Sequence, residues 1–90
     1  MSFDVDELLY LAAFPTRAEI LNVVQKFDPI CVSRISEVLS LTQNQTSKHL
    51  TKLREAGLVK ADRSGRTVYY RLADEPCLRD FLKWRRRYRQ

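Results

Sequence analysis

The 90-residue sequence has few of the residues from which catalytic and cofactor sites are usually built: one histidine, two cysteines and two glycines. The two glycines form no glycine-rich phosphate-binding loop. A single histidine and two separated cysteines provide no cluster of metal ligands. No nucleophile–base pair or paired carboxylates are apparent either. The sequence therefore predicts neither an enzyme nor a metal or cofactor site.

Long hydrophobic runs are also missing. No apolar stretch approaches the roughly 18–20 residues that are needed to span a bilayer. The first seven residues are acidic, and they lack the basic start and apolar centre of a signal peptide. We therefore expect a cytoplasmic protein with no membrane partner, in which Cys31 and Cys77 are reduced thiols rather than a structural disulfide.

The charge of the chain is unevenly distributed. The net charge is +5, but residues 1–30 carry two positive and five negative side chains, whereas residues 31–90 carry fourteen and six. Lys and Arg displace counterions from phosphates, so a basic region favours a polyanionic partner. A basic surface kept only for solubility has the same composition, and charge alone therefore does not identify the partner.

Hydrophobic spacing predicts four helices in the first two thirds of the chain. The first spans about 4–13, and the second begins at Pro15 and is ended by Asp28 and Pro29. A short third helix at about 33–39 is expected to direct Ile35, Val38 and Leu39 inward, and residues 40–42 form a tight corner. The expected apolar face of the second helix consists of Ala18, Ile20, Leu21, Val24 and Phe27.

The fourth predicted helix, at about 43–56, has Thr42 as its N-cap and Gly57 after its end. Thr46, Leu50 and Leu53 form its inward stripe. After Gly57 the period changes to that of strands, at 58–63 and 66–72, joined by a turn at 64–65. A last helix is expected at about 74–88. The sequence predicts one domain, 1–90, of mainly α class with a small β-hairpin: a winged helix-turn-helix (about 33–56) with its wing at about 58–72.

Four stretches of the chain resemble the ArsR/SmtB family of bacterial repressors. Residues 14–21 resemble the family's second-helix signature, and residues 47–50, 53–59 and 65–72 resemble its recognition helix and wing. The resemblance covers about two thirds of the chain. It implies a homodimer built on the first and last helices, which represses its own operon and is released by an inducer.

The exposed face of the helix at 43–56 and the wing supply the residues expected to contact double-stranded DNA. Gln43, Asn44 and Gln45 present three amides, which bond adenine edges in the major groove. The positions expected to contact phosphates or to flank the readout are Ser47, Lys48, His49, Lys52, Arg63, Arg66 and Thr67. For His49, a structural role and a phosphate contact both remain open. A solvated hairpin tip is the alternative for the wing.

The last helix carries an apolar seam with a spacing of four, three and four residues, which is typical of a helix–helix contact. The expected dimer interface combines this seam with the first helix and consists of Val5, Leu8, Leu9, Ala12, Cys77, Phe81, Trp84 and Tyr88. The basic residues between 83 and 89 face either phosphate or water. We predict a sequence-specific homodimeric repressor that binds an imperfect palindrome with half-sites about one helical turn (~10 bp) apart.

The inducer cannot be named from the sequence. The family's thiolate site reads Cys-Val-Cys, but this chain has Cys31, Val32 and Ser33, and no histidine follows His49, so neither of the family's metal sites is complete. Two alternatives to a plain repressor stay open: a repressor that responds to redox state through Cys31 and Cys77, and a winged helix that binds a protein partner instead of DNA.

Overall fold

The computed structural model describes residues 15–74 and 76–88. The elements, in chain order, are α2 (Pro15–Phe27), β1 (Ile30–Cys31), α3 (Val32–Leu39), α4 (Gln43–Glu55), β2 (Val59–Ser64), β3 (Thr67–Leu72) and α5 (Pro76–Tyr88). The predicted helix at 4–13 lies outside the described residues. The chain is mainly helical with an antiparallel hairpin after α4, as predicted. No helix in the described ranges is long and apolar enough to cross a membrane.

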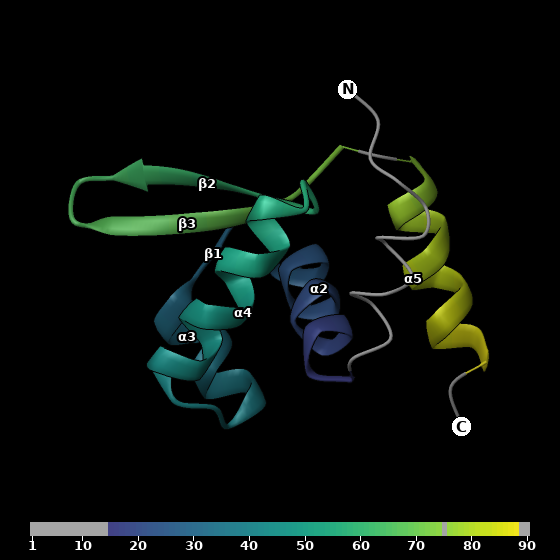
Figure 1. Ribbon diagram of the computed structural model, residues 1–90, viewed down its shortest axis with the longest axis horizontal. Coiled ribbons are helices and arrows are strands. Elements are labelled where there is room, and N and C mark those ends of the chain that lie inside the picture. The colour runs from purple at the N-terminus through teal and green to yellow at the C-terminus, as the bar shows by residue number, and fades with distance from the viewer. Residues whose placement is uncertain (1–14, 75, 89–90) are drawn as a thin grey trace.

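The helix α2 lies at the centre of the molecule, between the α3–α4 pair and α5 (Figure 1). Its residues Ile20, Leu21 and Val24 are fully buried, because spacings of one, three and four place them on one side of the helix. They share one core with Leu50 and Leu53 of α4, with Leu58 and Val59, and with Leu78 and Leu82 of α5. This core holds the helix-turn-helix against the rest of the domain.

The sheet has three strands in the order β1-β3-β2, all antiparallel. The prediction of a hairpin alone was therefore incomplete, because Ile30 and Cys31 pair with Tyr70 and Tyr69 of β3. The turn lies one residue later than predicted, at 65–66, because Ser64 pairs with Thr67. Gly65, with φ 62°, is the first central residue, as a type II′ turn requires.

Two side chains that were predicted to face inward are exposed. Val38 is 43% and Phe27 is 41% exposed. On α3 the inward side is formed instead by Ile35 and Ser36, with Leu39 packed against the core. Ser36 can replace Val38 there because its hydroxyl is hydrogen-bonded, so its burial carries little penalty. Phe27 is the last residue of α2 and lies beyond the core, under the Nζ of Lys26 at 5.5 Å.

Candidate nucleic-acid interface

A three-residue corner sets the angle between α3 and α4. Ser40 ends α3 in the left-handed conformation, with φ 56° and ψ 43°. The backbone N–H of Leu41 then donates to the carbonyl of Ser36 at 3.0 Å. This bond satisfies a carbonyl at the end of α3, and the left-handed residue turns the chain into the corner. The sequence placed this corner correctly at 40–42.

A buried pair of hydroxyls joins α3 to α4. The Oγ of Ser36 lies 2.8 Å from Oγ1 of Thr46 and 2.9 Å from the carbonyl of Val32. The hydroxyl of Thr46 donates to the carbonyl of Thr42 at 2.9 Å. Since a hydroxyl has one proton, Thr46 accepts from Ser36, whose own proton is shared between Thr46 and the carbonyl of Val32. The pair fixes the register of the two helices, and hence the direction in which α4 presents its outer face.

The first turn of α4 closes with a capping box. The side chain of Thr42 accepts from the backbone N–H of Gln45 at 3.0 Å, and Oε1 of Gln45 accepts from the N–H of Thr42 at 3.0 Å. The sequence predicted Thr42 as the N-cap but missed the return bond, although Thr followed by Gln three residues later is its usual signature. The acceptor of Gln45 is thus engaged within the protein. The cap does not use its NH₂ group, and the side chains of Gln43 and Asn44 make no hydrogen bond among the residues that the structure describes.

The outer face of α4 is polar and exposed, and its inner face is apolar. Thr46, Leu50 and Leu53 are buried as predicted. The predicted contact residues on the other side are all exposed: Gln43, Asn44, Gln45, Ser47, Lys48 and Lys52. Gln43, Asn44 and Gln45 lie in the first turn of the helix, the part of a recognition helix that reaches base edges.

His49 lies at the border of these two faces and contacts α2. The Nε–H of Arg17 donates to its Nδ1 at 3.4 Å. Partial burial, and then the positive charge of Arg17, lower the pKa of His49 from its ordinary value of 6.5. The imidazole is therefore neutral at pH 7. The sequence contained no sign of this partner, which is 32 residues away.

The register of the hairpin separates its charges by face. Directly paired residues share a face of the sheet, and Arg63 pairs with Val68, which is half-buried. Arg63 therefore lies on the face that packs toward α4, whereas its neighbour Asp62 pairs with the exposed Tyr69 on the outer face. Arg66 is exposed in the turn, and Thr67 is half-buried at its end.

An ion-paired arginine supports the base of the wing. The Nε of Arg71 lies 3.7 Å from a carboxylate oxygen of Asp28 and 3.8 Å from one of Asp62. It thus links β3 to β2 and to the segment before β1. Within the described part of the chain, Arg63 and Arg66 form no ion pair of this kind, so the basic side chains nearer the tip keep their charge available for a phosphate.

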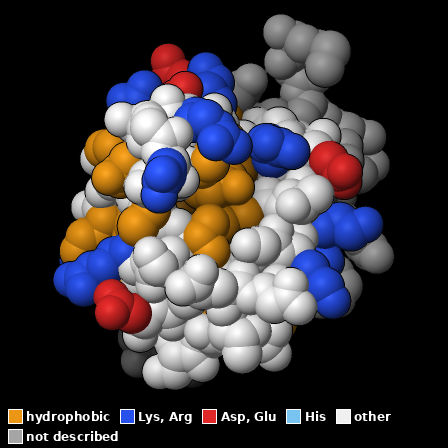
Figure 2. All heavy atoms as spheres, turned by 90° about the vertical axis from the view of Figure 1, so that its left-hand side faces the viewer, with side chains coloured by type: hydrophobic (Ala, Val, Ile, Leu, Met, Phe, Trp, Pro, Cys, Tyr) orange, Lys and Arg blue, Asp and Glu red, His pale blue; other side chains and the backbone are white. Residues whose placement is uncertain are grey.

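At the end of the molecule that carries the wing tip, most of the charged side chains are basic (Figure 2). Figure 2 shows Lys and Arg side chains bordering an apolar patch on this face, with more of them along one side and few acids. The wing tip and the α3–α4 pair lie at the same end of the molecule (Figure 1). A face that concentrates positive charge beside exposed amides has the electrostatic form of a nucleic-acid interface.

The thiol and metal predictions are only partly covered by the described residues. Cys31 is half-buried, and its Sγ lies 3.5 Å from Oγ of Ser33. The pKa of the Cys31 thiol is lowered, mainly by its hydrogen bond with the hydroxyl of Ser33 and further by backbone N–H groups. The side chain of Cys77 lies outside the described residues. Among the residues that the structure describes, no group of three His, Cys, Asp or Glu is placed to hold a metal ion.

The predicted dimer seam also falls mostly outside the described part. Phe81 is half-buried and packs against the core of its own chain. The side chains of Cys77, Trp84 and Tyr88 on α5 are not among those described, and neither are Val5, Leu8, Leu9 and Ala12. The seam remains a prediction.

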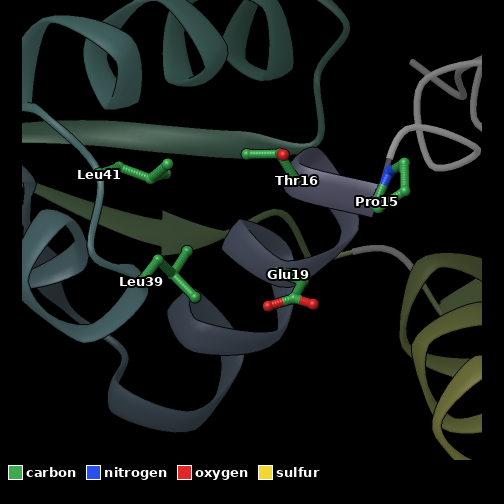
Figure 3. Close-up of a pocket in the computed structure, with 5 residues that line it drawn as sticks. All are labelled: Pro15, Thr16, Glu19, Leu39 and Leu41. Atoms are coloured by element: carbon green, nitrogen blue, oxygen red, sulfur yellow. The ribbon is translucent and has the colours of Figure 1, made fainter.

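A hollow of about 180 Å³ lies between the first turn of α2 and the helix-turn-helix corner (Figure 3). Pro15, Thr16 and Glu19 of α2 line one side, and Leu39 and Leu41 line the other. The lining contains one carboxylate and no Lys, Arg or His, so the hollow does not belong to the basic surface.

A helix-turn-helix that is followed directly by a β-hairpin defines the winged helix-turn-helix class. Among solved structures, reduced HlyU from Vibrio cholerae has this chain's fold with a TM-score of 0.84 at 30% identity, over 96% of this chain and 90% of HlyU. A possible ArsR-family regulator from Mycobacterium bovis, described as a homodimeric winged helix-turn-helix DNA-binding domain, has a TM-score of 0.79 at 24% identity, over 91% and 74% of the two chains.

The sequence comparisons identify the family. A model of the arsR family of bacterial regulatory proteins matches residues 15–61. The transcriptional repressor PagR of Bacillus anthracis is 37% identical over 84 residues, which cover 92% of this chain and 83% of PagR. The chain belongs to the arsR family, as the resemblance predicted. It spans only between 47% and 56% of the length of three other curated relatives that it matches.

Proposed function

We propose that this chain is a homodimeric DNA-binding transcriptional repressor. Its relatives include transcriptional regulators and repressors, and a solved relative is described as a homodimeric DNA-binding domain. The observation that carries the proposal is the exposed outer face of α4, which presents three amides in its first turn and two lysines further along, while the opposite stripe is fully buried.

In this proposal α4 lies in the major groove and the wing lies along the adjacent backbone or minor groove. Gln43 and Asn44 read base edges, since both ends of their side-chain amides are available for the bidentate bonds that recognise adenine. Gln45 contributes only its NH₂ donor, because its oxygen caps the helix. Ser47, Lys48 and Lys52 contact phosphates.

The wing adds positive charge from a second direction. Arg63 lies on the α4 side of the sheet and Arg66 in the turn, so both reach toward the same duplex as α4. Each phosphate that an arginine neutralises adds about 0.9 to the slope of log K against log salt concentration. The relatives that repress transcription favour this binding mode over a protein–protein module.

Base reading is tested by selecting bound duplexes from a random pool and then measuring affinity for the selected site and for random DNA. Asn44→Ala should weaken binding to the selected site by about 1–3 kcal/mol while binding to random DNA changes little. Arg79→Ala on α5 is the matched control for loss of an exposed polar side chain. Equal losses of Asn44→Ala on both duplexes would remove α4 from base reading.

Dimerisation is tested separately. Sedimentation of the wild-type chain should show a dimer. Trp84→Ala should shift the monomer–dimer balance toward monomer, because the sequence predicts this residue in the dimer seam and a buried aromatic ring contributes strongly to association. The selected DNA sites should then be palindromic with half-sites about 10 bp apart. A monomer that selects single half-sites would refute the dimer.

A further inference from the structure

The contact between Arg17 and His49 joins the start of α2 to the middle of α4. The guanidinium Nε of Arg17 donates to Nδ1 of His49 at 3.4 Å, and the contact is partly buried. Arg17 lies in neither the helix-turn-helix nor the wing, and no sequence motif connects the two residues. The contact is thus a polar link between a side chain of α2 and one of α4.

The bond determines the form of the imidazole. A histidine nitrogen accepts a hydrogen bond only when it has no proton, so the proton of the neutral ring lies on Nε2. If Nδ1 were protonated, its N–H would point at the N–H of Arg17 and the hydrogen bond would be lost. The imidazolium would also place a second positive charge beside Arg17. Burial and Arg17 both lower the pKa of His49, in agreement with this geometry.

Other charged groups near α4 do not account for this state of His49. The α3 helix, which packs on α4, carries Arg34 and Glu37, and these pair with each other at 3.2 Å. The β2 strand carries Lys60, Asp62 and Arg63, all exposed. The two causes that shift the pKa of His49 are its burial and Arg17.

His49 occupies a position from which it can act on DNA. It follows Gln45 by four residues and precedes Lys52 by three, and residues at these spacings are neighbours on the surface of a helix. We propose that Arg17 is a positioning residue for DNA binding: it holds His49 neutral, with its proton on Nε2, as a hydrogen-bond donor to a backbone phosphate between Gln45 and Lys52. This inference rests on the proposed function and adds a residue to its binding machinery.

The mechanism is specific about charge. Arg17 acts through His49 and does not itself contact a phosphate, so the group that the pair presents to the duplex is the neutral N–H of His49. A neutral N–H donor to phosphate adds affinity without releasing a further counterion. Loss of either member should therefore lower affinity but leave the salt slope unchanged, which separates this role from a direct phosphate contact by Arg17.

The first experiment follows the imidazole signals of His49 by NMR as the pH is varied. His49 is the only histidine of the chain, so its titration is read without overlap. Arg17→Gln should raise the pKa of His49 toward 6.5, its ordinary value. Lys26→Gln, which removes a positive charge from the other end of α2, should leave it unchanged. An unaltered titration in a folded Arg17→Gln protein overturns the proposal.

The second experiment is a double-mutant cycle on affinity for the selected duplex, at several salt concentrations. Arg17→Gln and His49→Gln should each weaken binding about fivefold, as loss of one hydrogen bond does. The double variant should be no weaker than His49→Gln alone, and all salt slopes should match the wild type. If the affinity losses of the two single variants multiply in the double variant, or if the salt slope of Arg17→Gln is lower by about one, Arg17 contacts DNA directly and the proposal is overturned. Arg17→Lys, which keeps the charge, is the milder variant if Arg17→Gln unfolds.

The two proposals fail in different ways. A wild-type chain that binds no duplex would refute the proposed function and the DNA part of this inference together. Normal DNA binding with additive effects in the cycle would refute only the role of Arg17. The NMR titration reads the contact itself in either case.

Discussion

The capping box of α4 provides a quantitative test of how the recognition helix is held. Thr42→Ala removes the hydroxyl that accepts from the N–H of Gln45 at 3.0 Å. The carbonyl of Thr42, which accepts from Thr46, is unaffected, so the change is confined to the cap. Replacing a Thr N-cap by Ala costs about 0.5–2 kcal/mol, typically about 1.

The structure favours a value near the middle of this range. Thr42 and Gln45 are exposed, so water replaces the lost partner and no buried group is left unpaired. A change of about 1 kcal/mol in a domain of this size lowers the melting temperature by about 4–8 °C. Gln45→Ala, which removes only the return bond to Thr42, should cost less, about 0.5 kcal/mol.

The assay is reversible urea unfolding followed by circular dichroism. Thr42→Ser keeps the hydroxyl and should remain near the wild type, whereas Gln43→Ala, in the same turn but outside the box, should change stability little. Equal midpoints for the wild type and Thr42→Ala would refute the assignment of the cap. Asn44→Ala should affect DNA discrimination alone, but Gln45→Ala should also affect stability.

Three further predictions concern stability. Thr46→Val should destabilise the domain by about 1–2 kcal/mol in urea unfolding, since it deletes the buried hydroxyl bonded to Ser36; no loss would mean that this pair does not hold α3 to α4. Because the pKa of His49 is lowered in the folded state, the unfolded chain binds more protons just below pH 6.5, so stability should fall as the pH is lowered through that range. His49→Gln should weaken this dependence, and an identical pH profile would contradict it. Arg71→Ala should cost less than about 1 kcal/mol, because that side chain is 53% exposed; a loss of several kcal/mol would mean that its pairs with the carboxylates are structural anchors of the wing.

The helices and the corner follow from the sequence because their signals are local. Thr46, Leu50 and Leu53 recur at the spacing of a helix. Gly57 has φ 80°, the left-handed conformation in which a glycine commonly ends a helix. The strand β1 has two residues, which is too short for an alternating pattern to be seen. It exists because β3 offers an open edge, a property of the folded sheet.

The site divides in the same way. The outer face of α4 could be predicted from periodicity, because exposure follows from the buried stripe. The engagement of Gln45 in the cap could have been read from its spacing to Thr42, but the adenine-reading role of amides outweighed it. The bond between Arg17 and His49 depends on how α2 packs on α4, and no local pattern encodes that packing.

The strand β1 has a mechanical consequence for recognition. It runs directly into α3 and pairs with β3. The wing is therefore attached to the helix-turn-helix in two places: through the chain from α4 into β2, and through the pairing of β3 with β1. Swinging the wing away from α4 would require this pairing to break. In the proposed complex, the spacing between the two groove contacts of one half-site is thus set before DNA binds, which spares the entropy of ordering a loose arm. In the proposed dimer, any tolerance for operators of different length must therefore come from the joint between protomers.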